Sequence, residues 1–202
     1  MGTKKCKKEY ERNRNECGCG ISIKEEIPYG LVIKLPRGWL LNHYGGKEGF
    51  LGWLALQPRE HREQLCELNE YEQEGLGKHI QSIEATLRDY WKTEFRDDGF
   101  ERMYVFYFSE YSKHLHFHLI SRTRELGKLA LCSKVCSEFK ESVASAGAIA
   151  WNIPFATKCE DFPDEYKIAP KGQYDKRVGK LMDHLKNNLP GAAVYSRKRE
   201  NG

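Results

Sequence analysis

The sequence has no apolar run long enough to cross a membrane and no opening segment that resembles a secretory signal. Its start is rich in lysine, with no hydrophobic segment directly behind it. A membrane-spanning helix needs about 20 largely apolar residues, and a signal peptide needs an apolar core after its basic start. We therefore expect a cytoplasmic protein without a membrane partner.

The chain also lacks the regular cysteine pairs of a disulfide framework. Its seven cysteines are odd in number and irregularly spaced, which favours reduced thiols in the cytosol. Internal repeats and low-complexity segments are missing too, which argues against a repeat array.

Charge of one sign is not in large excess. The 33 Lys and Arg residues against 29 Asp and Glu residues give a net charge of +4. This suits an anionic substrate but does not demand nucleic acid. A chain of 202 residues, 40% hydrophobic and 31% charged, is long enough for one buried core and an extension.

One stretch stands out, His114-Leu115-His116-Phe117-His118-Leu119-Ile120. Histidine and apolar residues alternate with the period of a β-strand. The pattern predicts three histidines on one face of a strand and the residues between them in the core.

Two interpretations fit such a row of histidines. One is a metal site, but the outer two histidines would lie about 13 Å apart on a regular strand, so one ion would reach all three only if the strand were bulged. The other is a phosphate site, in which one imidazole attacks phosphorus and its neighbours hydrogen-bond the oxygens. The phosphate site fits better, because it needs no distortion.

The stretch resembles the histidine triad signature, His-φ-His-φ-His-φ-φ with φ hydrophobic, at every position, and Arg122 follows as an arginine often does in that family. The resemblance extends upstream to about residue 25. It implies a nucleotidyl hydrolase or transferase with a nucleotidyl-histidine intermediate. His116 would be the nucleophile, and His114 and His118 would orient it and bond the phosphate oxygens. A histidine rather than glutamine at His118 places the chain nearer the hydrolase branch.

The resemblance also suggests substrate-binding residues. In family hydrolases the loop before the triad supplies polar groups to the phosphates, and here Ser112 and Lys113 lie closest, although both could be ordinary turn residues. Asn42, in an expected loop after strand 39–41, is a further candidate. A nucleobase pocket would be aliphatic, and its candidate residues are Leu31, Ile33 and Leu41.

The segment from Gly52 to Pro58 departs from the family pattern at one position. It resembles the family strand that begins Gly-His, but Trp53 stands where the histidine is expected. That histidine often helps to order the active-site histidines. The replacement leaves open whether the hydrogen-bond network is kept.

No cofactor is assigned. Some triad proteins bind zinc through Cys-x-x-Cys and two downstream histidines. Here Cys17 and Cys19 have a shorter spacing, while His61 and His114 occupy the positions of the family's zinc histidines. Zinc therefore stays an open alternative.

The resemblance and the apolar periodicity together predict an α+β fold. We expect a twisted antiparallel sheet of about five strands, a long covering helix over 59–95 and a helical C-terminal extension with helices at 128–146 and 174–189. The expected organisation is a basic flexible tail at 1–20, a histidine-triad-like catalytic domain at 21–125 and an extension at 126–202.

The expected function is hydrolysis of a nucleoside phosphate derivative, of the dinucleoside polyphosphate or nucleoside phosphoramidate type, by a homodimer. Two alternatives remain. The basic termini and the extra C-terminal region would suit adenylated or capped nucleic-acid ends. Trp53 and the short loop before the triad would suit a nucleotide-binding module that has lost turnover.

Overall fold

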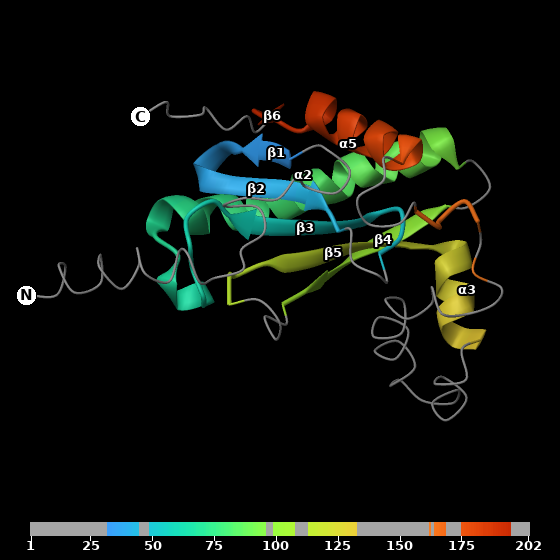
Figure 1. Ribbon diagram of the computed structural model, residues 1–202, viewed down its shortest axis with the longest axis horizontal. Coiled ribbons are helices and arrows are strands. Elements are labelled where there is room, and N and C mark those ends of the chain that lie inside the picture. The colour runs from blue at the N-terminus through green and yellow to red at the C-terminus, as the bar shows by residue number, and fades with distance from the viewer. Residues whose placement is uncertain are drawn as a thin grey trace, which may run out of the picture.

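The computed structural model describes residues 32–44, 49–95, 99–107, 113–132, 162, 164–168 and 175–194. Within them, six strands form one antiparallel sheet in the order β4-β5-β3-β2-β1-β6 (Figure 1). The strands are β1 Val32–Leu35, β2 Trp39–His43, β3 Trp53–Pro58, β4 Phe100–Phe106, β5 Phe117–Thr123 and β6 Ala193–Val194. The helices are α2 Glu70–Glu94, α3 Arg124–Cys132 and α5 Lys176–Asn188, with short 3-10 turns at Pro36–Gly38 and Leu65–Glu67.

The predicted α+β class is confirmed, with one strand more than expected. The additional strand is β6, whose two residues pair with β1 through Ile33↔Val194 and Lys34↔Ala193. Strand β5 begins at Phe117, so His114 and His116 precede it rather than lying within it. None of the helices in the described ranges is both long and apolar enough to span a membrane.

Helix α2 begins later than predicted. Asn69 caps it, because its side chain accepts a hydrogen bond from the Glu72 backbone at 2.9 Å and the Glu72 carboxylate accepts one from the Asn69 backbone at 3.0 Å. Residues 59–69 therefore lie before the helix and include the short 3-10 turn at Leu65–Glu67. Gly75 and Gly77 lie inside the helix without breaking it.

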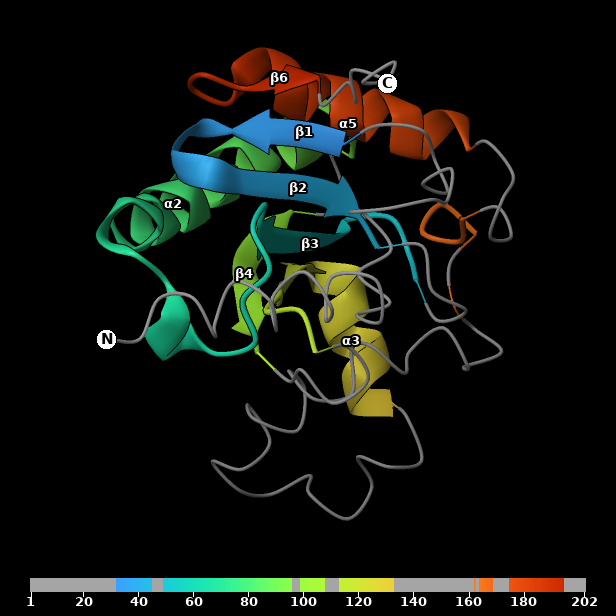
Figure 2. The ribbon, with the colours of Figure 1, turned by 60° about the vertical axis from the view of Figure 1, so that its left-hand side comes forward.

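Helices α2 and α5 cover the same face of the sheet (Figures 1 and 2). The inward-facing residues predicted for the last helix are all buried: Val178, Leu181, Met182, Leu185 and Leu189. They belong to one hydrophobic cluster with Ile83, Leu87 and Trp91 of α2. Residues 175–194 therefore complete the core on which the strands rest. The helix predicted at 128–146 begins earlier, because α3 spans Arg124–Cys132. The rest of that predicted helix lies outside the described residues. The predicted tail at 1–20 also lies outside them.

The strand register separates the two faces of the sheet. Ile33 pairs with Leu41, Leu41 with Leu56, and Leu56 with Phe117, so these buried apolar side chains share one face of the sheet. Asn42 pairs with Ala55 and Ala55 with His118 on the opposite face. The suggestion that Ile33 and Leu41 line a nucleobase pocket beside the histidines is therefore wrong. Leu31 lies outside the described residues.

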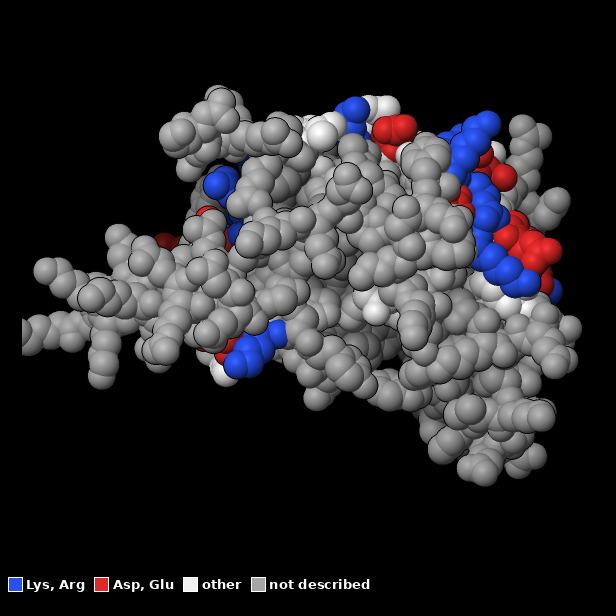
Figure 3. All heavy atoms as spheres, in the orientation of Figure 1, with Lys and Arg blue, Asp and Glu red and all other residues white. Residues whose placement is uncertain are grey.

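Charged groups of both signs lie close together on the surface. On the face drawn in Figure 3, blue and red atoms of the described residues lie side by side. The ion pairs that join opposite charges include Lys167–Asp164 at 2.6 Å and Arg177–Asp175 at 3.3 Å. Pairs as exposed as Lys167–Asp164 contribute little to stability.

Candidate functional site

Two of the three predicted site histidines come together at the start of β5. The ring centroids of His116 and His118 are 4.8 Å apart, and their Nε2 atoms are 3.2 Å apart. His118 is buried, whereas His116 is partly exposed. The alternation in the sequence thus brings these two rings into contact.

The backbone fixes the protonation pattern of His116. Its Nδ1 lies 2.8 Å from the carbonyl oxygen of His114. Because a carbonyl oxygen only accepts, Nδ1 must carry the proton and donate it. A neutral His116 therefore has its lone pair on Nε2, the nitrogen that faces His118.

Trp53 fixes the protonation pattern of His118. The indole Nε1 of Trp53 lies 3.0 Å from His118 Nδ1, and an indole N–H can only donate. The lone pair of His118 is therefore on Nδ1 and its proton on Nε2, from which it donates to His116 Nε2. The tryptophan in place of the family's histidine thus orders the third histidine itself.

Aromatic packing holds Trp53 in position. Tyr44 stacks on it with centroids 4.4 Å apart, and Phe50 packs at 5.5 Å. Tyr44 also meets the His118 ring edge-on at 5.1 Å. Gly52, directly before Trp53, has φ of 93°, and a Cβ there would lie 2.7 Å from Trp91 of α2. Only glycine allows this close approach between the start of β3 and the helix.

His114 has a different environment from the other two histidines. Its Nε2 donates to the Pro58 carbonyl at 2.8 Å, and its ring packs edge-on against His61 at 5.3 Å. Its contact with His116 runs through its backbone carbonyl. The structure thus gives His114 a part in orienting His116, but through the main chain.

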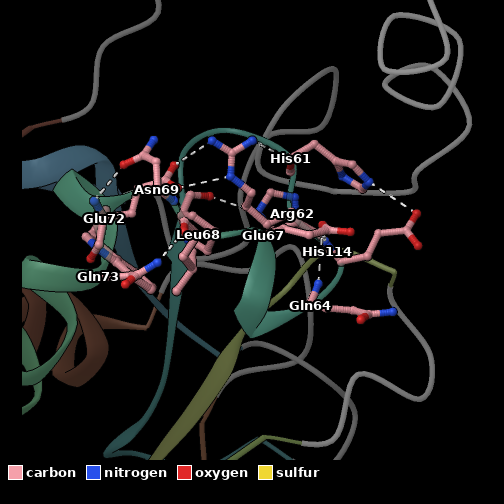
Figure 4. A network of polar contacts seen from close by, with 12 residues as sticks. His61, Arg62, Gln64, Glu67, Leu68, Asn69, Glu72, Gln73 and His114 are labelled. Carbon is pink, nitrogen blue, oxygen red and sulfur yellow. Dashed lines mark hydrogen bonds and ion pairs between the residues drawn. The ribbon is translucent and has the colours of Figure 1, made fainter. Parts of the chain in front are cut away.

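A buried ion pair anchors the segment that leads to these histidines (Figure 4). Arg62 makes two contacts with the Glu72 carboxylate, at 3.0 and 3.2 Å. The Arg62 carbonyl in turn accepts a hydrogen bond from the Leu115 backbone at 2.6 Å. The first turn of α2 therefore helps to place the residues around His114 and His116. The Asn69-x-x-Glu72 spacing signals the helix cap, but nothing in the sequence pairs Glu72 with Arg62.

Burial keeps two of the site histidines neutral. Loss of hydration lowers the pKa of His118 to about 4, with a further contribution from nearby His116. Burial likewise lowers the pKa of His114 to about 4, against the opposing effect of its bond to Pro58. At neutral pH both rings are therefore uncharged, and for His118 the hydrogen bond that its Nδ1 accepts from Trp53 requires the same.

The predicted substrate-binding residues are spread over the site. Asn42 lies in β2 rather than in a loop, on the same face as His118 with β3 between them. Its Nδ2 donates to the His43 carbonyl at 3.0 Å, and its buried Oδ1 has no hydrogen-bond partner in the described part of the chain. Lys113 is exposed directly before His114. Ser112 lies outside the described residues.

The described residues offer at most part of a zinc site. His61 and His114 lie side by side, as the resemblance implies for zinc histidines. Cys17 and Cys19 fall outside the described ranges. Within those ranges no group of three histidine, cysteine or acidic residues is arranged to hold a metal ion.

Comparisons with known proteins find a distant structural likeness to a solved structure. No protein-family model and no curated protein sequence matches the chain. A histidine triad protein from Bradyrhizobium japonicum is 14% identical, and the alignment covers 84% of this chain and 92% of that one with a TM-score of 0.43. A likeness this remote establishes neither the family nor the activity of this chain.

Proposed function

We propose that this protein is a nucleotidyl hydrolase of the histidine triad type, with His116 as its nucleophile. The observation that carries the proposal is the bond from His116 Nδ1 to the His114 carbonyl, at 2.8 Å. It leaves the Nε2 lone pair on the partly exposed side chain of a neutral imidazole. Such a nucleophile is well suited to phosphorus, because it is not repelled by phosphate oxygens as an anion would be.

The first step forms a bond between His116 Nε2 and the α-phosphorus of a nucleoside phosphate derivative. The bond from phosphorus to the leaving group breaks, and the leaving group takes its electron pair. Water then attacks the same phosphorus, which releases the nucleotide and restores the imidazole. The substrate types proposed for this step are dinucleoside polyphosphates and nucleoside phosphoramidates.

His118 would support this step as a hydrogen-bond donor. Its Nε2–H points at His116 Nε2 from 3.2 Å. When the nucleophile turns to phosphorus, the same N–H can move to a phosphate oxygen beside it. A preorganised donor of this kind favours the transition state as charge develops on the oxygens. The exposed Lys113, with Ser112 and Asn42, is proposed to contribute to substrate binding.

The test is intact mass spectrometry of wild-type protein and the His116→Ala variant after mixing with adenosine and guanosine phosphate derivatives, with product release followed in parallel. We expect turnover and a transient nucleotidyl adduct in the wild type. Loss of the nucleophile should lower turnover at least about 10³-fold and abolish the adduct. His184→Ala is the matched control, since His184 lies on α5 against Tyr90 and should leave activity unchanged.

Two other outcomes would redirect the interpretation. Nucleotide binding without turnover in either protein would contradict the hydrolase and leave the binding module. Turnover confined to adenylated or capped oligonucleotides, with binding that weakens steeply with salt, would keep the chemistry and move the substrate to nucleic-acid ends.

A further inference from the structure

We infer that Trp53 restricts this triad to substrates whose leaving group departs without receiving a proton from it, namely phosphoric anhydrides such as dinucleoside polyphosphates, and disfavours phosphoramidates. The inference rests on the proposed function and decides between its two substrate types. It follows from the direction of each hydrogen bond among the three histidines.

The proton that His118 directs toward the substrate cannot be given away. It lies on Nε2, because Trp53 donates to Nδ1 at 3.0 Å. If a neutral His118 released that proton, an imidazolate would remain, and Trp53 has no acidic proton to replace the one lost. His118 can therefore donate a hydrogen bond but cannot act as a general acid in this state.

A doubly protonated His118 is disfavoured by the same contact. A proton on Nδ1 would point directly at the indole N–H of Trp53, so that two donors would face each other across 3.0 Å. Burial acts in the same direction, since it lowers the pKa of this histidine to about 4. The charged form that could protonate a leaving group is therefore scarce at neutral pH.

The remaining ring protons of the triad are directed away from the reaction. The Nδ1 proton of His116 is bound to the His114 carbonyl, on the side of the ring opposite the nucleophilic nitrogen. The Nε2 proton of His114 is bound to the Pro58 carbonyl. None of the three histidines thus has a proton to transfer to a leaving group.

The two substrate types differ in whether they need such a proton. When an anhydride is cleaved, the P–O bond breaks with its electron pair on oxygen, and the phosphate released is stable as an anion near neutral pH. When a phosphoramidate is cleaved, the P–N bond breaks and the departing nitrogen must gain one proton. General acid catalysis of that kind is worth typically about 10²–10⁴-fold.

The experiment compares kcat/KM for diadenosine polyphosphate and for an adenosine phosphoramidate with the same nucleoside. We expect the wild type to prefer the anhydride by at least about 100-fold. Trp53→His, which puts a group able to accept or donate beside His118 Nδ1, should reduce that preference at least about 10-fold. Trp53→Phe keeps an aromatic ring against Tyr44 and removes the facing N–H, but it provides no acceptor for a proton on Nδ1, so it should reduce the preference less than Trp53→His does.

A second readout does not depend on activity. Nitrogen-15 NMR of labelled histidines should place the proton of His118 on Nε2 in the wild type, and Trp53→His should allow it on Nδ1. Equal wild-type use of both substrates, or a proton on Nδ1 of His118 in the wild type, would overturn the inference. Failure to turn over either substrate, with no adduct on His116, would instead mark failure of the proposed hydrolase on which the inference rests.

Discussion

Removal of the ion pair between Glu72 and Arg62 should disturb the region around the site. The Glu72 side chain is 3% exposed and that of Arg62 21% exposed. Arg62→Met leaves a buried carboxylate without its cationic partner, which typically costs about 3–5 kcal/mol. The double variant with Glu72→Gln should be less destabilised than the sum of the two single variants. Urea unfolding of the four proteins measures the coupling, and simple additivity would show that the pair contributes no such energy.

At the residue scale, local patterns in the sequence were informative and contacts between distant residues were not. The alternation predicted that Leu115, Phe117 and Leu119 enter the core, and all three are buried. It could not predict the bond between Trp53 and His118, because the two residues are 65 positions apart and meet only through the register of β3 on β5. The resemblance left open whether Trp53 keeps the hydrogen-bond network, and the structure shows that its indole N–H donates to His118.

At the scale of elements, periodicity identified the long helix but not its beginning. The helix predicted over 59–95 includes Leu65, which is 42% exposed, and Leu68, which is buried but lies before the first residue of α2. The capping box formed by Asn69 and Glu72 is the local signal in the sequence that marks where the helix begins. For β1 and β2, the residue types indicated strands, but which face each residue occupies became clear only from the pairing with β3.

Two glycines in α2 provide a matched pair of substitutions with opposite expected effects. Gly77→Ala places a methyl group where no heavy atom lies within 4 Å, and should stabilise the helix by about 0.5–1 kcal/mol. Gly75→Ala has the same intrinsic benefit, but its Cβ would lie 3.0 Å from Arg37 Cβ and 3.1 Å from both His79 and Trp39. We expect a net loss of about 1–3 kcal/mol from overpacking.

Thermal or urea unfolding of the two variants measures the difference. Equal stabilisation by both would mean that the turn at Arg37 moves aside without cost. That result would contradict the close packing of α2 against Trp39, whose indole also donates to the Glu72 carbonyl at 2.9 Å.

At the scale of the whole molecule, the class of fold and the buried face of the last helix were predictable, whereas the last strand was not. Strand and helix patterns are enough for an α+β sheet with helices on one face. Strand β6 has two exposed residues, too few for any pattern. The homodimer stays a prediction, which the mass in solution by light scattering would test.

Acid should destabilise the whole molecule over a defined pH range. Burial lowers the pKa of His43 to about 4, although the carboxylate of Asp175 opposes the shift. His114 and His118 have pKa values lowered to the same level. As the pH falls below about 6.5, the unfolded chain binds protons at these histidines and the folded chain does not. Each then costs about 1.4 kcal/mol of stability per pH unit, until the pH approaches about 4.

The measurement is the free energy of unfolding in urea between pH 7.5 and 4.5. His43→Gln should lower the slope of the unfolding free energy with pH by the equivalent of up to one bound proton. The contributions of His114 and His118 to that slope should remain. A wild-type stability that stays constant over this range would contradict neutral buried histidines.

The pairing of Ile33 with Val194 has a consequence for how this protein can be handled. It makes the first and last described strands neighbours at one edge of the sheet (Figure 1). A short peptide could therefore join residue 194 to residue 32, and new termini could be placed elsewhere in the chain, as in a circular permutation. A label or a solid support attached through that junction would sit at the far edge from β5, with β3, β2 and β1 between it and the histidines.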